Sequence, residues 1–269
     1  MLKQRVLVVV LLLPIVIAAI MQGGWVLGLL ISLLLGMAVW EYSLLFKAGG
    51  LKPAGFLVVA GVVLLTLTRT AQNLEYDSVI VVGLAMLLMA IHLREFEKGR
   101  DQAGSDFAAS LSGLIYIGFL GGYMVLLRNL PEGQWWLLTV LPAVWLADSG
   151  AYFIGKRFGV HKMAPRLSPK KSWEGYFGGI VVALIGTPLL MSLYHNWGLP
   201  VGGAFTPLNA VLIGLVMGVF PTLGDLGESM LKRQFGVKDS GSILPGHGGI
   251  FDRIDSWLWA VTIGYYLIT

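Results

Sequence analysis

Long apolar runs alternate with short polar segments along almost the whole chain. About 17–25 apolar residues cross a bilayer as a helix, so these runs predict membrane helices. Nine are recognised, at residues 6–21, 24–46, 54–70, 78–93, 107–128, 135–155, 172–194, 207–225 and 253–269. The run at 78–93 is marginal in length and is expected to tilt or to pack against a neighbour. The pattern predicts an all-α, polytopic integral membrane protein with about nine transmembrane helices.

The composition agrees with a membrane protein. The chain is 56% hydrophobic and 13% charged, whereas a soluble domain has about 25% charged residues. The absence of cysteine excludes disulfides, thiolate metal sites and cysteine nucleophiles. With no soluble domain or polar linker, residues 1–269 are interpreted as a single membrane domain, with N-terminal spans in 1–130 and catalytic spans and cytoplasmic loops in 131–269.

The N-terminus resembles a secretory signal peptide, because Lys3 and Arg5 precede an apolar run and Ala18 lies among small residues. The apolar pattern, however, restarts at Trp25, and the first run contains Pro14. These features favour a retained first span over a cleaved signal. The compact chain without a targeting extension suggests the bacterial cell (inner) membrane.

The basic residues are distributed asymmetrically between the two sides predicted by nine spans. If the N-terminus is cytoplasmic, the outer loops hold only Arg69 and Arg128 of the 19 lysines and arginines. Cytoplasmic loops of membrane proteins carry such an excess of Lys and Arg. The orientation is therefore N-in/C-out. It also explains the pI near 9.3, so no nucleic-acid partner is expected.

The sixth apolar run carries Asp148 and Ser149 near its inner end. A carboxylate that faced lipid would cost several kcal/mol. Asp148 is therefore expected to face protein or a water-filled cavity, where it serves the function of the protein. A buried Asp148 bonded to a neighbouring helix is the structural alternative.

The segment RLSPKKSWEG, residues 166–175, precedes the seventh run. Ser168-Pro169 predicts a turn, and Lys170, Lys171 and Ser172 come just before a helix N-terminus, which is a plausible site for phosphate. Lysines beside a membrane also set topology and bind anionic lipid, so that interpretation stays open.

Carboxylates are paired at two helix ends. Asp225 and Glu228 are three residues apart and share a helical face, and Glu228 can pair with Lys232. Asp252 and Asp255 have the same spacing at the start of the ninth run. Carboxylates without cysteine, and with few histidines, favour Mg²⁺, Mn²⁺ or Ca²⁺. Asp225 and Asp252 are predicted to form a hard-cation site; the alternative is that the carboxylates only form ion pairs with Lys232, Arg233 and Arg253.

Between these helix ends lie Lys238-Asp239 and a glycine-rich turn at 245–249. Glycine lets backbone N–H groups approach an anion closely. His247 in this turn is a candidate base or ligand, although a lone loop histidine is more often only a hydrogen-bonding residue.

Residues 229–255 resemble the signature of the phosphatidate cytidylyltransferases, also called CDP-diacylglycerol synthases. The matching positions are Ser229, Leu231, Lys232, Arg233, Lys238, Asp239, Gly241, Leu244, Pro245, His247, Gly248, Gly249, Asp252, Arg253 and Asp255. The segments at 147–149 and 168–172 also resemble upstream motifs of that family. The resemblance covers about the C-terminal half, because residues 1–130 match only in being several apolar spans.

The resemblance implies a reaction in phospholipid biosynthesis. CTP and phosphatidic acid give CDP-diacylglycerol and pyrophosphate at the cytosolic face of the membrane. It also implies a polytopic helical fold, a homodimer, and Mg²⁺ held by the carboxylates of Asp225 and Asp252, with K⁺ beside it.

Roles follow for the remaining candidates. Lys170, Lys171 and Lys238 would neutralise phosphate oxygens, and Asp239 would orient Lys238 or a metal-bound water. The catalytic candidates are Asp225, Asp252, Lys238, Asp239 and Asp148, and the substrate-binding candidates are Ser149, Lys170, Lys171, Ser172, Glu228, Lys232, Arg233, His247, Gly248, Gly249, Arg253 and Asp255.

Two other functions would use similar groups. A CTP-dependent lipid kinase would transfer the γ-phosphate and release CDP. A cation or proton transporter would more typically place carboxylates nearer mid-membrane, on broken helices in related halves.

Overall fold

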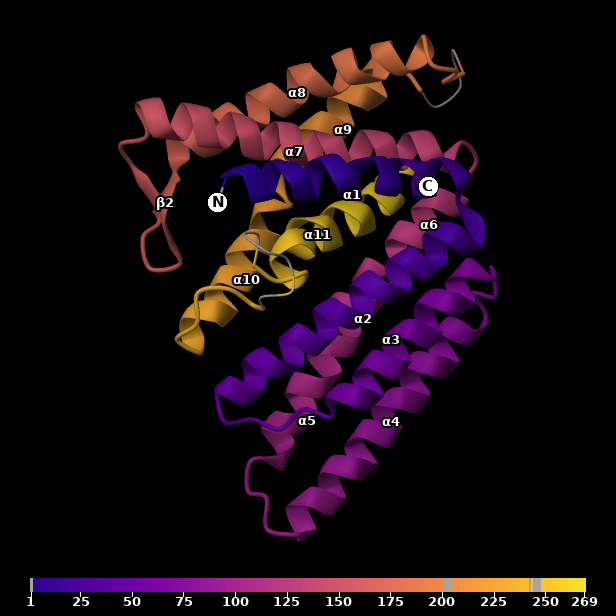
Figure 1. Cartoon of the computed structure of the whole chain (residues 1–269), viewed down its shortest axis with the longest axis vertical. Coiled ribbons are helices and arrows are strands. Elements are labelled where there is room, and N and C mark those ends of the chain that lie inside the picture. Colours follow the sequence, from indigo (N-terminus) through magenta and orange to yellow (C-terminus); the bar gives the residue numbers. More distant parts are fainter. Residues whose placement is uncertain (1, 201–204, 242, 244–247) are drawn as a thin grey trace. The chain divides into compact units, whose positions relative to one another are not determined.

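The computed structural model describes residues 2–200, 205–241, 243 and 248–269, and Figure 1 shows their helical ribbon. The chain divides into two compact units. The first unit contains Met1–Asn129 and Leu231–Ile254, and the second contains Leu130–Met230 and Asp255–Thr269. The boundaries at Met230/Leu231 and Ile254/Asp255 fall within helices. Each unit is described by itself.

The first unit is helical throughout its N-terminal part. Its elements are α1 (Leu2–Gln22), α2 (Gly24–Ala48), α3 (Gly55–Thr70), α4 (Tyr76–Glu97), α5 (Ala103–Ser112), the π-helix η1 (Gly113–Phe119) and α6 (Tyr123–Asn129). Helices α2, α3 and α4 lie side by side (Figure 1). Small residues allow this packing: a Cβ at Gly28 of α2 would collide with Thr70, and a Cβ at Gly61 of α3 would lie 2.5 Å from Leu84.

One end of the first unit is organised by Asp106, which is 1% exposed. Its carboxylate accepts hydrogen bonds from the backbone N–H of Lys52, at 2.7 Å, and from Arg100 Nε, at 2.7 Å. Arg100 also donates to the carbonyl of Gly50. The loops after α2 and after α4 therefore lie together, at the end where the sequence predicts cytoplasm.

The opposite end of the first unit contains both basic residues that the predicted topology places outside. Arg69 is fully buried, pairs with Asp77 at 2.7 Å and donates to the carbonyl of Phe119. Arg128 donates to the carbonyl of Ile20, near the end of α1. These two arginines thus have intramolecular partners, which is compatible with the predicted outer side for this end.

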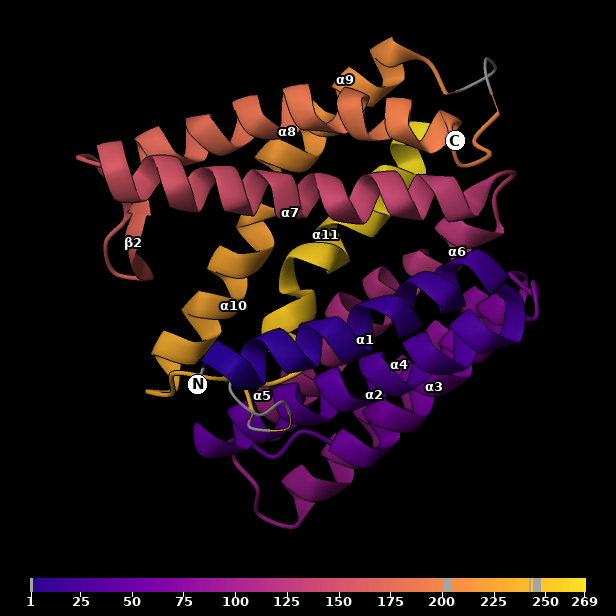
Figure 2. The same cartoon turned by 45° about the horizontal axis from the view of Figure 1, so that its top comes forward.

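The second unit is built on a long helical pair. It contains α7 (Gly133–Phe158), β1 (Lys162–Ala164), β2 (Ser168–Ser172), α8 (Trp173–His195), α9 (Pro207–Val219), most of α10 (Thr222–Gln234) and most of α11 (Phe251–Ile268). Helices α7 and α8 lie side by side, with the β-hairpin joining them at one end (Figures 1 and 2).

Glycines allow the close approach of α7 and α8. A Cβ at Gly179 would lie 2.5 Å from the carbonyl oxygen of Ala147, and one at Gly175 would lie 2.7 Å from that of Ala151. Such contacts bring helix backbones together in membranes, where small residues carry the packing. Gly179 is therefore a packing glycine.

Most of the predicted apolar runs coincide with helices to within a few residues at their ends. The fifth run is broken at Gly122 and the eighth at Phe220-Pro221, and the helix that ends the eighth run continues to Gln234, nine residues beyond its predicted end. Among the described residues, six helices are long and apolar enough to cross a membrane: Gly24–Ala48, Tyr76–Glu97, Ala103–Asn129, Gly133–Phe158, Trp173–His195 and Pro207–Gln234. Leu12–Gln22 and Gly55–Thr70 are shorter apolar helices. These features indicate a multi-pass membrane protein.

The β-hairpin departs from an all-α expectation, and it corrects one local prediction. Ser168 and Pro169 do not form the turn; they begin strand β2, and the turn covers residues 165–167. The N–H of Leu167 closes this turn on the carbonyl of Ala164, at 3.2 Å. Proline lacks a donor, but a two-stranded sheet consists of edge strands, where proline is tolerated.

Candidate active site

Three predicted polar segments meet in the second unit. Lys171, near the end of β2, places Nζ 2.5 Å from Oδ2 of Asp225, which lies in the first turn of α10. The two side chains are 25% and 36% exposed. Asp148 of α7 interacts electrostatically with both groups. Asp148, the Lys171–Asp225 ion pair and the basic hairpin thus form one charged cluster.

The position of Lys171 is fixed by its neighbour Ser172. The Ser172 side chain is buried and caps α8 by accepting a hydrogen bond from the N–H of Gly175, at 3.2 Å. A serine hydroxyl satisfies an otherwise unpaired N–H group at a helix start. Ser172 also fills the space beside Gly159, where a Cβ would collide with its hydroxyl. The observed role of Ser172 is structural, and its contact with substrate remains a prediction.

Glu174 is a residue that the sequence analysis missed. Its carboxylate accepts from the backbone N–H groups of Val160 and His161, both at 3.1 Å, and lies 2.6 Å from His161 Nδ1. It ties the end of α7 to the start of α8, at the base of the hairpin. A recognisable signal was its place in the first turn of a helix, where acidic side chains are favoured.

Asp225 is positioned by the glycine that precedes it. A Cβ at Gly224 would collide with the carbonyl oxygen of Asp255, so the backbones of α10 and α11 approach closely there. Glu228 and Asp255 are buried, at 1% and 8% exposure. Asp225 is thus the most accessible of these three carboxylates.

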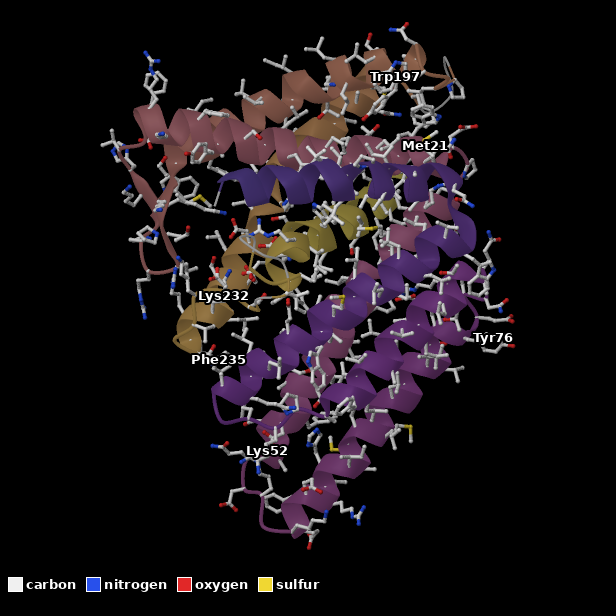
Figure 3. The ribbon with its side chains drawn as sticks, viewed as in Figure 1. Met21, Lys52, Tyr76, Trp197, Lys232 and Phe235 are labelled. Atoms are coloured by element: carbon white, nitrogen blue, oxygen red, sulfur yellow. The ribbon has the colours of Figure 1, made fainter. Side chains whose placement is uncertain are left out.

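In the first unit, Asp252 organises the loop between α10 and α11. Its Oδ1 accepts from Nζ of Lys232 at 2.6 Å, and its Oδ2 accepts from Ser240 N at 2.9 Å, Ser240 Oγ at 2.9 Å and Gly249 N at 2.8 Å. The Asp252 side chain is 4% exposed and that of Lys232 is 14% exposed; Figure 3 labels Lys232 on α10. The Lys232–Asp252 ion pair that was considered as an alternative is present, and it is largely shielded from solvent.

The glycines of the signature have a steric reason. Gly248 has a φ of +81°, which favours glycine, and a Cβ there would lie 2.8 Å from Oδ2 of Asp252. A Cβ at Gly241 or Gly249 would collide with the carboxylate of Glu41. The loop backbone therefore packs directly against two carboxylates.

Glu41 of α2 is the second residue that was missed. It is 1% exposed, and its Oε2 accepts from the N–H of Phe251 at 2.9 Å and from Ser240 Oγ at 3.3 Å. A carboxylate inside an apolar run is by default a functional candidate, and Glu41 inside the run at 24–46 was such a signal.

The remaining candidates lie mostly at the surface. Exposed side chains belong to Ser149, Lys170, Arg233, Lys238, Asp239 and Arg253. The lysines and arginines in this set are accessible to phosphate groups. His247 lies outside the described residues. Asp225 belongs to the second unit and Asp252 to the first, so a cation shared by the two remains a prediction.

The carboxylates suit Mg²⁺ only in one binding mode. Among the described residues, no group of three or more His, Cys, Asp and Glu side chains could hold a metal ion. Mg²⁺ usually keeps several waters and binds one or two carboxylates together with substrate phosphates. Asp225 is open to solvent and could serve as one protein ligand in that mode. Both oxygens of Asp252 already accept hydrogen bonds, so a cation there would have to replace one of these donors.

Comparison with known proteins shows the family to which the chain belongs. A model of the "Cytidylyltransferase family" matches residues 3–269. A phosphatidate cytidylyltransferase of Staphylococcus saprophyticus is 33% identical over 261 residues, which cover 97% of this chain and 96% of that protein. Those of Staphylococcus epidermidis and Staphylococcus aureus are 34% and 33% identical over 263 and 267 residues, with the same coverage. The chain therefore belongs to the cytidylyltransferase family.

Proposed function

We propose that this protein is a phosphatidate cytidylyltransferase, which transfers CMP from CTP to phosphatidic acid and releases pyrophosphate. The observation that carries the proposal is the full-length match to relatives of that name, each covered over 96% of its length. The product is CDP-diacylglycerol, an intermediate of phospholipid synthesis. The two charged clusters of the chain supply the groups that such chemistry needs.

The membrane arrangement of the proposal has about nine spans, with the N-terminus inside and the C-terminus outside, in a bacterial cell membrane. Its support is the distribution of charge in the first unit. Lys52 and Arg100 lie at the end organised by Asp106, and the outer arginines Arg69 and Arg128 are engaged by protein groups. Cytosolic CTP and bilayer phosphatidate would then meet at the inner interface.

The reaction is a substitution at the α-phosphorus of CTP. A phosphate oxygen of phosphatidate forms the new P–O bond, the bond from the α-phosphorus to the α,β-bridging oxygen breaks, and pyrophosphate leaves with the electron pair. The nucleophile is already an anion, so it needs no strong general base. Catalysis consists mainly of positioning and neutralisation of negative charge.

Asp225 and Asp252 would hold Mg²⁺, which supplies positive charge to the reacting phosphates when bound. Each carboxylate forms an ion pair with a lysine, Lys171 and Lys232 respectively. A carboxylate that binds a cation holds its lysine less strongly, so the ammonium becomes available to a phosphate oxygen. In the free protein each lysine would thus occupy the place of the cation beside its carboxylate. In the complex it would bind a phosphate oxygen.

Other side chains have supporting roles in this mechanism. Lys170 and Lys238 are exposed cations that would bind phosphate oxygens. Asp239 would orient Lys238 or a water, and Asp148 with Ser149 would line the site beside Lys171. K⁺ beside Mg²⁺ and a homodimer complete the proposal, on the ground of the family resemblance.

In the experiment that tests this proposal, the purified protein is incubated with CTP, phosphatidic acid in mixed micelles and Mg²⁺. Pyrophosphate and CDP-diacylglycerol are then measured. Equal amounts of the two products are expected only when both substrates are present, and excess EDTA is expected to abolish turnover. Release of CDP together with a phosphorylated lipid would instead indicate a lipid kinase. Ion flux in liposomes without CTP turnover would indicate a transporter.

A further inference from the structure

Glu41 is a buried carboxylate far from the signature in sequence. It lies in α2, near the cytoplasmic end predicted for that helix, and is 1% exposed. The family resemblance found in the sequence assigns nothing to residues 1–130. The structure nevertheless brings Glu41 against the signature loop, within the first unit.

The contacts of Glu41 converge on both ends of that loop. Oε2 accepts a hydrogen bond from the N–H of Phe251 at 2.9 Å, at the start of α11, and lies 3.3 Å from Ser240 Oγ. A buried N–H of Phe251 without such an acceptor would be destabilising, because its lost hydration would not be replaced. Glu41 therefore fixes the helix start that carries Asp252.

Ser240 links the two carboxylates directly. Its hydroxyl is 2.9 Å from Oδ2 of Asp252 and 3.3 Å from Oε2 of Glu41. A hydroxyl has one proton, which is shared between these two acceptors. The Ser240 hydroxyl thus couples Asp252 to Glu41, in addition to the hydrogen bonds that Asp252 accepts from Lys232, Ser240 N and Gly249 N.

Steric contacts with Glu41 also restrict which residues the loop can carry. A Cβ at Gly241 or at Gly249 would collide with the carboxylate of Glu41. The loop backbone is therefore in contact with Glu41 at two positions eight residues apart in sequence. The glycines in this part of the signature accommodate a side chain from α2.

We propose that Glu41 is a positioning residue that holds Ser240, Gly241 and the start of α11, and through them the carboxylate of Asp252, in the geometry required for nucleotidyl transfer. The inference rests on the proposed function. It assigns to Glu41 an acceptor role through Oε2, and no direct contact with the reacting atoms. An amide oxygen could fill the same role.

The test compares Glu41→Ala and Glu41→Gln in the full-length protein, with Asp106→Asn as the matched control. Asp106 is an equally buried carboxylate of the same unit that organises a different loop. Two readouts are used: hydrogen–deuterium exchange of peptides covering residues 236–252, and the dependence of turnover on Mg²⁺ and CTP. The exchange readout is independent of the reaction.

For Glu41→Ala we expect faster exchange in residues 236–252 and a loss of about 10–100-fold in activity or in apparent Mg²⁺ affinity, as is typical when a group that orients a metal ligand is removed. For Glu41→Gln we expect the wild-type exchange pattern and activity within about threefold, because the acceptor is retained. Asp106→Asn is expected to lower thermal stability without changing either readout.

Unchanged exchange and activity in folded Glu41→Ala would overturn the inference. So would a Glu41→Gln protein as impaired as Glu41→Ala, because charge rather than hydrogen bonding would then be required. Equal changes in Asp106→Asn would show a general loss of stability. If wild-type protein makes no CDP-diacylglycerol, the proposed function fails, while the exchange result still decides whether Glu41 holds the loop.

Discussion

Lys171 and Asp225 form an ion pair of 2.5 Å between the end of a β-hairpin and the first turn of α10. Both groups retain access to solvent, with 25% and 36% of their side-chain surfaces exposed. Exposed ion pairs contribute only about 0–1 kcal/mol to stability. Stability alone therefore gives this pair little reason to form, and its exposure is compatible with the proposed binding of a cation and a phosphate.

Lys171→Ala tests the role of the ammonium. We expect kcat/KM for CTP to fall about 10–100-fold, because a hydrogen bond to a charged group contributes about 1.5–3 kcal/mol. Steady-state kinetics at saturating phosphatidate measure the effect. Lys156→Ala is the control, since Lys156 lies in the last turn of α7 in the same unit and over the ring of Tyr152. Equal rates for Lys171→Ala and wild type would contradict a phosphate-binding role.

Ser240→Ala removes the hydroxyl between Glu41 and Asp252. The expected result is a fall in kcat of about 2–10-fold, as for the loss of one ordinary hydrogen bond. The matched control is Ser43→Ala, because the buried Ser43 hydroxyl donates only within α2, to the carbonyl of Val39 at 2.9 Å. If both variants lose activity equally, the effect does not belong to the loop.

Gly249→Ala places a methyl group where Glu41 and Ser240 already lie. The loop must move away, so we expect activity to fall by more than about tenfold, the cost of a displaced metal ligand. Gly83→Ala is the control: Gly83 lies within α4 and a Cβ there meets nothing within 4 Å. Thermal unfolding followed by circular dichroism separates a local from a global effect. Wild-type activity in Gly249→Ala would be inconsistent with the described packing.

Arg69→Met tests the buried arginine of the outer end. The change leaves Asp77 and the carbonyl of Phe119 without their donor, and breaking a buried ion pair costs about 3–5 kcal/mol. A lower thermal midpoint in detergent is expected, with catalytic constants unchanged in the folded fraction. The double variant Arg69→Met/Asp77→Asn should recover part of the stability, because no uncompensated charge then remains. A midpoint equal to that of wild type would exclude this role.

The lengths of the apolar runs were sufficient to predict most of the helices, because a span needs only a continuous run of apolar residues. The hairpin was not predicted, since Ser168-Pro169 has turn composition and its strand is fixed by pairing with residues 162–164. The π-helix η1 within the fifth run also left no recognisable pattern. Such local forms depend on neighbours rather than on composition.

Candidate site residues were found where motifs are dense, as at Asp225, Lys171 and Asp252. Glu41 and Glu174 were not, because each acts through contacts with the loop or hairpin that only the folded chain reveals. Glu41 offered one signal, a carboxylate inside an apolar run. The signature lies about two hundred residues later in the sequence, so no local pattern connects Glu41 with it.

The position of an isotopic label tests the central claim most directly. Full-length protein is incubated with phosphatidic acid, Mg²⁺ and CTP labelled at either the α- or the γ-phosphorus, in wild type and in Asp225→Asn and Asp252→Asn. We predict that the α-label appears in the lipid and the γ-label in pyrophosphate, and that both variants lose nearly all turnover. A γ-label in the lipid, or normal turnover in either variant, would contradict the account.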